Sequence, residues 1–94
     1  MVETNRLFVY GIFLDESTRR AFGMSNPSYT TVKGWATIGG GIVEAVPDAK
    51  YTLTGVIVDV DPRYWGRIDS LERAYRRITV VTTDGERAYM YAAK

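Results

Sequence analysis

The sequence predicts an α+β fold, in which a small mixed, partly closed β-barrel carries one or two short helices. Segments rich in β-branched and aromatic residues outnumber segments with helical periodicity, so strands dominate. The segments follow the order strand, helix, three strands, helix and hairpin, and neighbouring strands can pair antiparallel. The chain has 94 residues and is 46% hydrophobic, so we expect residues 1–94 to form a single domain around a small core.

The first strand and the first helix are expected near the N-terminus. Residues 6–10, Arg-Leu-Phe-Val-Tyr, form a short apolar run that ends at Gly11, which is typical of a strand buried on both faces. Residues 15–22 are predicted to form a short helix, because Asp15 is a favourable N-cap and Gly23 favours a helix end.

Three strands are predicted in the middle of the chain, at residues 29–38, 42–46 and 51–60. Residues 25–28 have the composition of a loop, and residues 47–50 have that of a turn. Residues 39–41 are glycines that permit a tight or bulged connection, but they lack the GxGxxG pattern and the following helix of a phosphate-binding loop. Gly55 lies inside the longest strand and indicates a bulge or a close backbone approach.

The second helix is predicted over residues 61–72, with Asp61 as the N-cap and Pro62 in the first turn. At about 100° per residue, Glu72 falls on the apolar arc of this helix, which contains Tyr64, Trp65, Ile68 and Leu71. A carboxylate directed at a core costs free energy unless it is paired, hydrogen-bonded or neutral. Glu72 is therefore a candidate general acid/base with a raised pKa. The alternative is a helix-end residue that pairs with Arg76 or reaches outward.

The C-terminal part of the chain is predicted to be a β-hairpin. Residues 75–82 alternate between apolar and polar side chains, and residues 87–92 form a closing strand. Asp84-Gly85 between them is a strong signal for a tight turn.

The composition excludes several kinds of chemistry. The chain has no cysteine and no histidine, which excludes disulfides, thiol catalysis, histidine general bases and His or Cys metal ligands. Twelve Lys and Arg residues balance eleven Asp and Glu residues, so we expect no nucleic-acid partner. Asp59, Asp61 and Asp69 show no recurring ligand spacing, so we expect no metal.

No membrane partner is expected either, because no apolar run reaches the roughly 20 residues that span a bilayer. Residues 1–6 do not read as a signal peptide. The lack of cysteine fits a reducing compartment, and we expect a cytoplasmic protein.

Two weaker site candidates have structural alternatives. The glycine of Tyr10-Gly11 lets a ligand approach backbone N–H groups, although the pair also suits a simple turn from strand to helix. Arg77 follows Glu72 on the next strand and is able to bind a carboxylate through two hydrogen bonds, although an ordinary surface arginine is the better explanation of this residue taken alone. Together with Arg73 and Arg76 it forms a basic cluster that suits either a phosphate contact or a solvated face.

Taken in order, these segments resemble the γ-glutamylcyclotransferase-like superfamily, in particular its AIG2-like and γ-glutamylamine cyclotransferase branch. Members of that branch have a first strand with Tyr-Gly-Thr/Ser-Leu, a glycine-containing strand, a Leu-Asp-x-x-Glu helix, a Tyr-x-Arg strand and a final strand that ends in an aromatic residue. The resemblance covers nearly the whole chain. The counterparts here are Phe8-Val9-Tyr10-Gly11-Ile12-Phe13, residues 53–58, Ile68-Asp69-Ser70-Leu71-Glu72, Tyr75-Arg76-Arg77 and Ala88-Tyr89-Met90-Tyr91.

The resemblance implies a mixed barrel whose cavity lies beside the Tyr10–Phe13 loop. It implies that Glu72 is the catalytic residue and that the backbone of Tyr10, Gly11, Ile12 and Phe13 holds the amino-acid end of a γ-glutamyl group. Tyr75 and Arg77 complete the expected substrate-binding set. The implied reaction needs no metal or organic cofactor, and its partner is a small-molecule substrate.

The chain departs from the family pattern beside the loop. Ile12-Phe13 replaces Thr/Ser-Leu, which removes a hydroxyl and adds bulk at the expected cavity mouth. Leu14-Asp15-Glu16 replaces a basic residue and a glycine, and two acids are unfavourable near an anionic substrate unless they face away. The segment after Glu72 is shorter than usual, which predicts a more open pocket.

The expected function is a γ-glutamyl cyclotransferase that releases 5-oxoproline from a γ-glutamyl amine or peptide. The alternative is a non-catalytic protein that binds a small ligand in the same cavity; Ile12-Phe13 favours this alternative, and Glu72 favours the enzyme. A protein-interaction domain is a third class, in which a sheet edge forms a homodimer.

Overall fold

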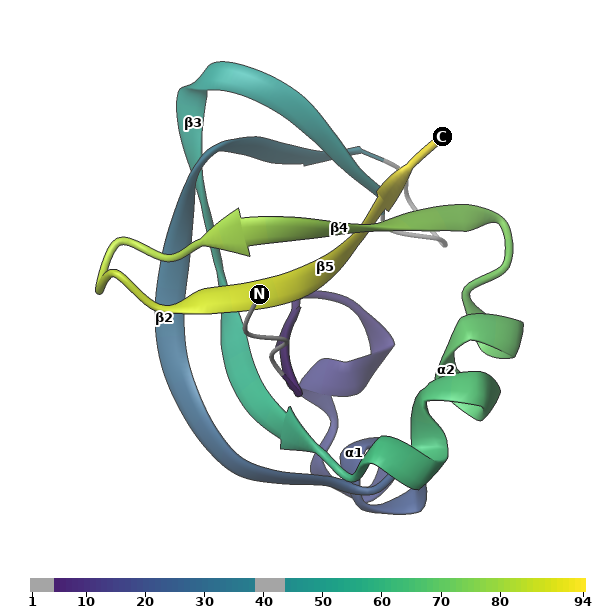
Figure 1. Ribbon diagram of the computed structural model, residues 1–94. Helices are drawn as coiled ribbons and strands as arrows, with labels where there is room; N and C mark the ends of the chain where they lie inside the picture. Colours follow the sequence, from purple (N-terminus) through teal and green to yellow (C-terminus); the bar gives the residue numbers. More distant parts are fainter. Residues whose placement is uncertain (1–4, 39–43) are drawn as a thin grey trace.

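The computed structural model describes residues 5–38 and 44–94, which form one five-stranded sheet and short helices (Figure 1). The sheet has the strand order β2-β3-β1-β5-β4, and only the β1–β5 pair is parallel. The elements are β1 (Arg6–Val9), the 3₁₀ turn η1 (Ile12–Leu14), α1 (Glu16–Ala21), β2 (Met24–Ile38), β3 (Glu44–Val60), the 3₁₀ turn η2 (Pro62–Tyr64), α2 (Trp65–Leu71), β4 (Tyr75–Val81) and β5 (Arg87–Ala93). The predicted α+β class is confirmed.

Strand β1 lies at the centre of the sheet. Leu7 pairs with Val58 of β3 on one side and with Tyr89 of β5 on the other. Leu7, Phe8 and Val9 are each at most 4% exposed. This confirms the prediction of a strand buried on both faces, and it explains why the segment is a continuous apolar run rather than an alternating one.

Two long strands, β2 and β3, replace the predicted three. The turn predicted at residues 47–50 is wrong, because these residues belong to β3. Pairing runs from Trp35↔Pro47 directly to Lys33↔Thr52, so the turn-like composition produces an irregularity inside a strand. The loop predicted at residues 25–28 likewise lies inside β2, where the pairing register shifts between Ser25 and Ser28.

The neighbouring predictions for this hairpin have different outcomes. Residues 44–46 of the strand predicted at 42–46 belong to β3, whereas residues 39–43 lie outside the described residues. Gly55 makes the predicted close approach: a Cβ there would lie 2.3 Å from the Val9 carbonyl oxygen and 2.7 Å from the Phe8 ring. The glycine therefore lets the backbone of β3 lie close to the end of β1, its neighbour in the sheet.

The sheet curls without closing. Strands β2 and β4 are its two edges, but the turn between β4 and β5 reaches back to β2. Thr83 N–H donates to the Thr31 carbonyl at 2.9 Å, and the Thr30 hydroxyl donates to Asp84 at 2.6 Å. Gly85 has the positive φ of 83° expected for a tight turn, so the Asp84-Gly85 signal is confirmed.

Figure 1 shows both helices on one side of the curled sheet. Helix α1 begins at its predicted cap, where the Asp15 carboxylate accepts from Thr18 N–H at 2.9 Å, and it ends before Gly23, which has a φ of 67°. Ile68 of α2 packs into the core between the helices and the sheet, with Leu7, Val9, Val56, Val58, Val60 and Tyr91. A second core fills the inside of the curl and contains Phe8, Val32, Leu53, Ile57, Val80 and Met90.

Candidate active site

A cavity of about 650 Å³ opens where the end of β1 faces the corner between α2 and β4. Its size suits a small-molecule site. It brings together Glu72, the whole Tyr10–Phe13 loop and Tyr75, which are far apart in the sequence. The lining residues are Phe8, Val9, Tyr10, Gly11, Ile12, Phe13, Leu14, Leu71, Glu72, Ala74, Tyr75 and Tyr91.

Glu72 follows the last residue of α2 and is held by its backbone on both sides. Its N–H donates to the Ile68 carbonyl at 2.9 Å, and its carbonyl accepts from Tyr75 N–H at 2.8 Å. The predicted helix is therefore one residue too long, because α2 ends at Leu71 and Glu72 is the C-cap. The residue ends the helix and directs its side chain into the cavity.

The Glu72 carboxyl is half-buried, and this burial raises its pKa above the usual range for a glutamate. No hydrogen bond or ion pair of the described residues involves this carboxyl, and the alternative pairing with Arg76 is not formed among them. Apolar surroundings without a counter-charge raise the pKa of a carboxyl, so that it gains and loses protons at a pH closer to neutral than an exposed glutamate does.

The Tyr10–Phe13 loop turns tightly from β1 into η1. The Gly11 carbonyl accepts from Leu14 N–H at 2.9 Å, and the Ile12 carbonyl accepts from Asp15 N–H at 3.2 Å. The N–H groups of Ile12 and Phe13 begin the turn, so they have no acceptor within it. The cavity-lining loop therefore carries backbone donors that an anionic ligand group is able to use.

The side chains of this loop are used mainly for packing. The Tyr10 hydroxyl donates to the Tyr91 carbonyl and accepts from Ala45 N–H at 3.1 Å, and burial raises the pKa of Tyr10 to about 12. Phe13 is 4% exposed and packs edge-on against Phe22, with ring centroids 5.3 Å apart. The bulk expected at the cavity mouth therefore comes from Ile12, which is 59% exposed.

The two acids after the loop do not line the cavity. The Asp15 carboxylate caps α1, and hydrogen bonds from Ser17 and Thr18 lower its pKa to about 2. Glu16 pairs with Arg20 at 2.9 Å on the exposed side of α1. Both carboxylates are therefore engaged in contacts of α1 and do not line the cavity.

Arg77 lies outside the cavity lining. Its guanidinium carbon is 4.6 Å from the Trp65 ring centroid and 4.8 Å from that of Tyr89. Its Nη1 is 3.4 Å from a carboxylate oxygen of Asp69. The structure does not bring Arg77 to the other predicted site residues, and its aromatic and ionic partners occupy its guanidinium.

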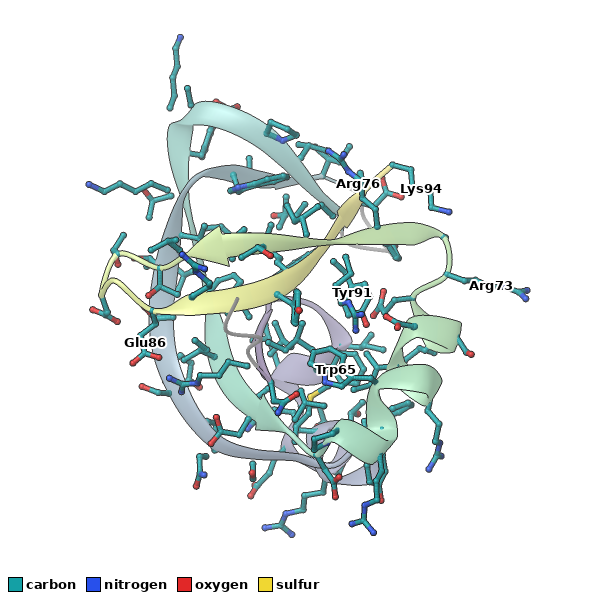
Figure 2. The ribbon with its side chains drawn as sticks, in the orientation of Figure 1. Trp65, Arg73, Arg76, Glu86, Tyr91 and Lys94 are labelled. Atoms are coloured by element: carbon teal, nitrogen blue, oxygen red, sulfur yellow. The ribbon has the colours of Figure 1, made fainter. Side chains whose placement is uncertain are left out.

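Tyr91 is the main lining residue that the sequence did not single out as a site residue. Its ring lines the cavity, and its hydroxyl donates to the Asp69 carboxylate at 2.5 Å (Figure 2 shows Tyr91 beside α2). Burial and this hydrogen bond raise the pKa of Tyr91. The family pattern could have revealed Tyr91, because its final strand ends in an aromatic residue and Tyr91 is the counterpart here. Leu14, Leu71 and Ala74 also line the cavity, but apolar residues carry no sequence signal that separates lining from core.

Two further absences hold for the described ranges. Residues 5–38 and 44–94 contain no cluster of three or more Asp, Glu, His or Cys side chains placed to hold a metal ion. None of the helices in this part of the chain is long and apolar enough to cross a membrane.

Comparison with known proteins identifies relatives of the fold. A family model described as gamma-glutamyl cyclotransferase, AIG2-like, matches residues 7–94. None of the curated proteins compared with the chain matches it. The uncharacterized protein PH0828 of Pyrococcus horikoshii superposes with a TM-score of 0.80 at 20% identity, over 96% of this chain and 78% of its own.

Two other solved structures are similar. The Arabidopsis thaliana protein At5g39720.1 superposes with a TM-score of 0.81 at 20% identity, over 98% of this chain and 70% of its own. A protein named gamma-glutamyl cyclotransferase superposes with a TM-score of 0.75 at 14% identity, over 98% of this chain and 68% of its own. At these identities the likeness is one of fold.

Proposed function

The chain belongs to the AIG2-like gamma-glutamyl cyclotransferase family, and on that premise we propose that it releases 5-oxoproline from a γ-glutamyl amine or peptide. Family membership supports a cyclotransferase-type function and a small-molecule substrate. The observation that carries the finer proposal is that a desolvated carboxyl, Glu72, shares one cavity with the backbone donors of the Tyr10–Phe13 loop.

In the proposed reaction Glu72 takes a proton from the substrate α-ammonium group. The free amine attacks the γ-carbonyl carbon, and the new N–C bond closes a five-membered ring. Glu72 then gives the proton to the leaving nitrogen as the old C–N bond breaks, and the second proton of the attacking nitrogen passes to the released amine, so 5-oxoproline and an ammonium ion result. One carboxyl serves as base and then as acid, and its protonation state is restored at the end.

The raised pKa of Glu72 suits both halves of this cycle. A carboxyl with an ordinary pKa is a weak proton donor at neutral pH, and burial brings the two protonation states closer in free energy. The half-buried position therefore supports the second step, in which the leaving nitrogen needs a proton.

Binding in this proposal uses the loop and Tyr75. The N–H groups of Ile12 and Phe13 hold the substrate carboxylate, and Tyr10 fixes the loop through its bonds to β5 and to Ala45. Tyr75 lines the same cavity, and in this proposal its hydroxyl serves as a donor to the reacting carbonyl. Holding the amine against the carbonyl supplies much of the rate in an intramolecular attack. Arg77 is left out of the proposed site because of its position.

Release of 5-oxoproline tests the proposal. Purified protein is incubated with a panel of γ-glutamyl amides and peptides, and 5-oxoproline is measured by mass spectrometry. We expect product from the wild type and from Glu16→Gln, an exposed glutamate outside the cavity, and none above background from Glu72→Gln. A fully active Glu72→Gln variant contradicts the mechanism.

A non-catalytic binding protein remains the second candidate. The loss of the loop hydroxyl at Ile12 favours it, because the site then has one polar group fewer for orienting a substrate. A saturable thermal shift with one γ-glutamyl compound and no 5-oxoproline from any of them selects this function.

Location and oligomeric state stay predictions. We propose a cytoplasmic protein, and a homodimer formed through one of the open sheet edges, β2 or β4. Sedimentation at several protein concentrations measures the second of these directly.

A further inference from the structure

Tyr91 is hydrogen-bonded at both of its ends. Its carbonyl, on β5, accepts from the Tyr10 hydroxyl of the cavity-lining loop. Its own hydroxyl donates to the Asp69 carboxylate of α2 at 2.5 Å, and Figure 2 shows the side chain beside this helix. Tyr91 also lines the cavity. One residue therefore connects two sides of the cavity, which are the donor loop and the helix that ends at Glu72.

The hydrogen bonds continue in both directions. The Tyr10 hydroxyl also accepts from Ala45 N–H of β3 at 3.1 Å, and Nη1 of Arg77, on β4, lies 3.4 Å from the second carboxylate oxygen of Asp69. Burial raises the pKa of Tyr10 to about 12 and raises that of Tyr91, so both hydroxyls stay protonated near neutral pH. We call this chain, Ala45–Tyr10–Tyr91–Asp69–Arg77, the tyrosine bridge.

The end of α2 has few other attachments to the sheet. Ile68 is fully buried in the core, but Leu71, one turn later, is 46% exposed. In the part of the chain that the structure describes, residues 69–72 make side-chain hydrogen bonds or ion pairs only through Asp69. The position of Glu72, which directly follows this last turn, therefore depends on the tyrosine bridge.

A hydrogen-bonded chain of this kind has two possible roles. If it only stabilises the fold, its loss lowers the fraction of folded protein, and the molecules that remain folded react at the normal rate. If it sets the separation between the two sides of the site, its loss misplaces groups in folded molecules. A displacement of about 1 Å between reacting groups lowers a rate by as much as about 10²-fold.

We propose, resting on the cyclotransferase function above, that Tyr91 is a positioning residue that fixes the separation between the anion-binding loop and Glu72. Its carbonyl end holds the loop that receives the substrate carboxylate. Its hydroxyl end holds the last turn of the helix that carries the acid/base. Tyr91 acts through Tyr10 and Asp69 in this role, so the two ends have separable effects, one on substrate binding and one on proton transfer.

Substitutions at the two ends are expected to change different kinetic constants. Tyr91→Phe removes the hydroxyl end and is expected to lower kcat by about three- to tenfold, with KM within about twofold of the wild type. Tyr10→Phe releases the loop and is expected to raise KM by about three- to tenfold, with a smaller effect on kcat. Tyr29→Phe is the matched control, because Tyr29 is 83% exposed and does not line the cavity. A Tyr91→Phe variant with the kinetic constants of the control overturns the inference.

A double variant separates positioning from general destabilisation. Tyr91→Phe and Asp69→Asn both weaken the hydroxyl end, so the combination is expected to lose no more than about twofold in kcat beyond the more impaired single variant. Losses that multiply contradict joint action through one contact. Tyr91→Phe is expected to fold, because Asp69 is 45% exposed and gains water in place of the hydroxyl. If Tyr10→Phe does not fold, Tyr91→Phe and the double variant decide.

The pKa of Glu72 provides a measurement that needs no turnover. It is obtained by NMR titration of the side-chain carboxyl carbon. Release of the last turn lets water reach the carboxyl, so Tyr91→Phe is expected to bring the pKa of Glu72 down toward the ordinary value of 4.5. Tyr10 and Tyr75, which share the cavity with Glu72, have raised pKa values and stay uncharged, so the change reports solvation of the carboxyl.

This titration distinguishes failure of the inference from failure of the proposed function. If the wild type releases no 5-oxoproline from any γ-glutamyl compound, the cyclotransferase function fails, and the titration alone decides the positioning role. A lowered pKa of Glu72 in Tyr91→Phe, with an unchanged one in Tyr29→Phe, then supports the role. Equal pKa values in the wild type and in folded Tyr91→Phe overturn it.

Discussion

Two hollows of the described structure each contain one carboxylate, and their surroundings differ. The smaller hollow, of about 340 Å³, lies along the β2–β3 hairpin and is lined by Trp35, Ala36, Thr37, Ile38, Asp48, Tyr51, Thr52, Leu53 and Thr54. Its acid, Asp48, accepts a hydrogen bond from Lys50 N–H at 3.0 Å and stabilises the irregularity in β3. In the larger cavity, no described residue bonds to the carboxyl of Glu72.

This difference is the reason for proposing a chemical role for Glu72 and not for Asp48. A carboxylate that completes a backbone turn contributes to the fold, as Asp48 does by accepting from Lys50 N–H. A carboxyl that is desolvated without a partner costs free energy in the folded protein, so the fold gains nothing from keeping it there. The four predictions that follow test this comparison, from the largest expected effect to the smallest.

The largest effect is expected when the two acids are neutralised one at a time. Glu72→Gln is expected to lower kcat by roughly 10²- to 10⁴-fold, because it removes the proton acceptor and donor. Asp48→Asn is expected to leave kcat unchanged, since Asp48 lies in the other hollow. Production of 5-oxoproline measures both, and equal losses in the two variants contradict the contrast between the hollows.

The second effect concerns the close contact between β3 and the end of β1, whose residues Phe8 and Val9 line the larger cavity. Gly55→Ala is expected to destabilise the protein by about 2–3 kcal/mol, because the new methyl group would lie 2.3 Å from the Val9 carbonyl oxygen. Gly66→Ala is the control, since a Cβ there meets nothing within 4 Å and alanine favours helix α2 by up to about 1 kcal/mol. Urea unfolding measures both, and a neutral Gly55→Ala contradicts the close approach of β3 to β1.

The third effect concerns the support of Glu72. Asp69 connects α2 to β5 through Tyr91 and to β4 through Arg77, three residues before Glu72. Asp69→Asn is expected to cost about 1 kcal/mol of stability and to lower kcat by about three- to tenfold with little change in KM. Asp59→Asn is the matched control, because its side chain is equally exposed, at 45%, and pairs with Arg6 outside the cavity. A loss of kcat that is equal in both variants indicates general destabilisation instead of misplacement of Glu72.

The smallest effect is the pH dependence of stability at Glu72. Burial raises its folded pKa above the ordinary value of 4.5, so the folded state favours the protonated form. The cost of the buried charge is absent below pH 4.5 and complete above the raised pKa. The difference in Tm between Glu72→Gln and the wild type is therefore expected to be more positive at pH 8 than at pH 4. A pH-independent difference shows that the carboxyl is not desolvated.

Part of the fold was predictable because its signals are local. The apolar run of β1, the Asp15 cap of α1 and the Asp84-Gly85 turn each depend on neighbouring residues, and the structure has all three. The turn at residues 47–50 was predicted wrongly because proline and aspartate are common both in turns and at irregularities within strands, so their presence does not distinguish the two. Long-range pairing with β2 decided between the two.

The candidate site was predictable to a similar degree. Helical periodicity predicted that Glu72 faces apolar neighbours, and this holds although α2 ends one residue earlier. The residue directly after a helix still projects its side chain in nearly the direction that the helical repeat predicts. The role of Arg77 depends on Trp65, Tyr89 and Asp69, which come from other elements, so the residues beside it in the sequence did not reveal its position.

The parallel pairing of β1 with β5 has a consequence for biosynthesis. The Tyr10–Phe13 loop leaves the ribosome early, but Tyr91, which bonds to Tyr10 and lines the same cavity, is translated some eighty residues later. Until then one edge of the most apolar strand has no neighbour, and such an edge recruits other chains. Nascent chains stalled before β5 are therefore expected to depend on chaperones, and protection from hydrogen exchange of the Phe8 amide, which faces β5, should appear only once β5 has been added.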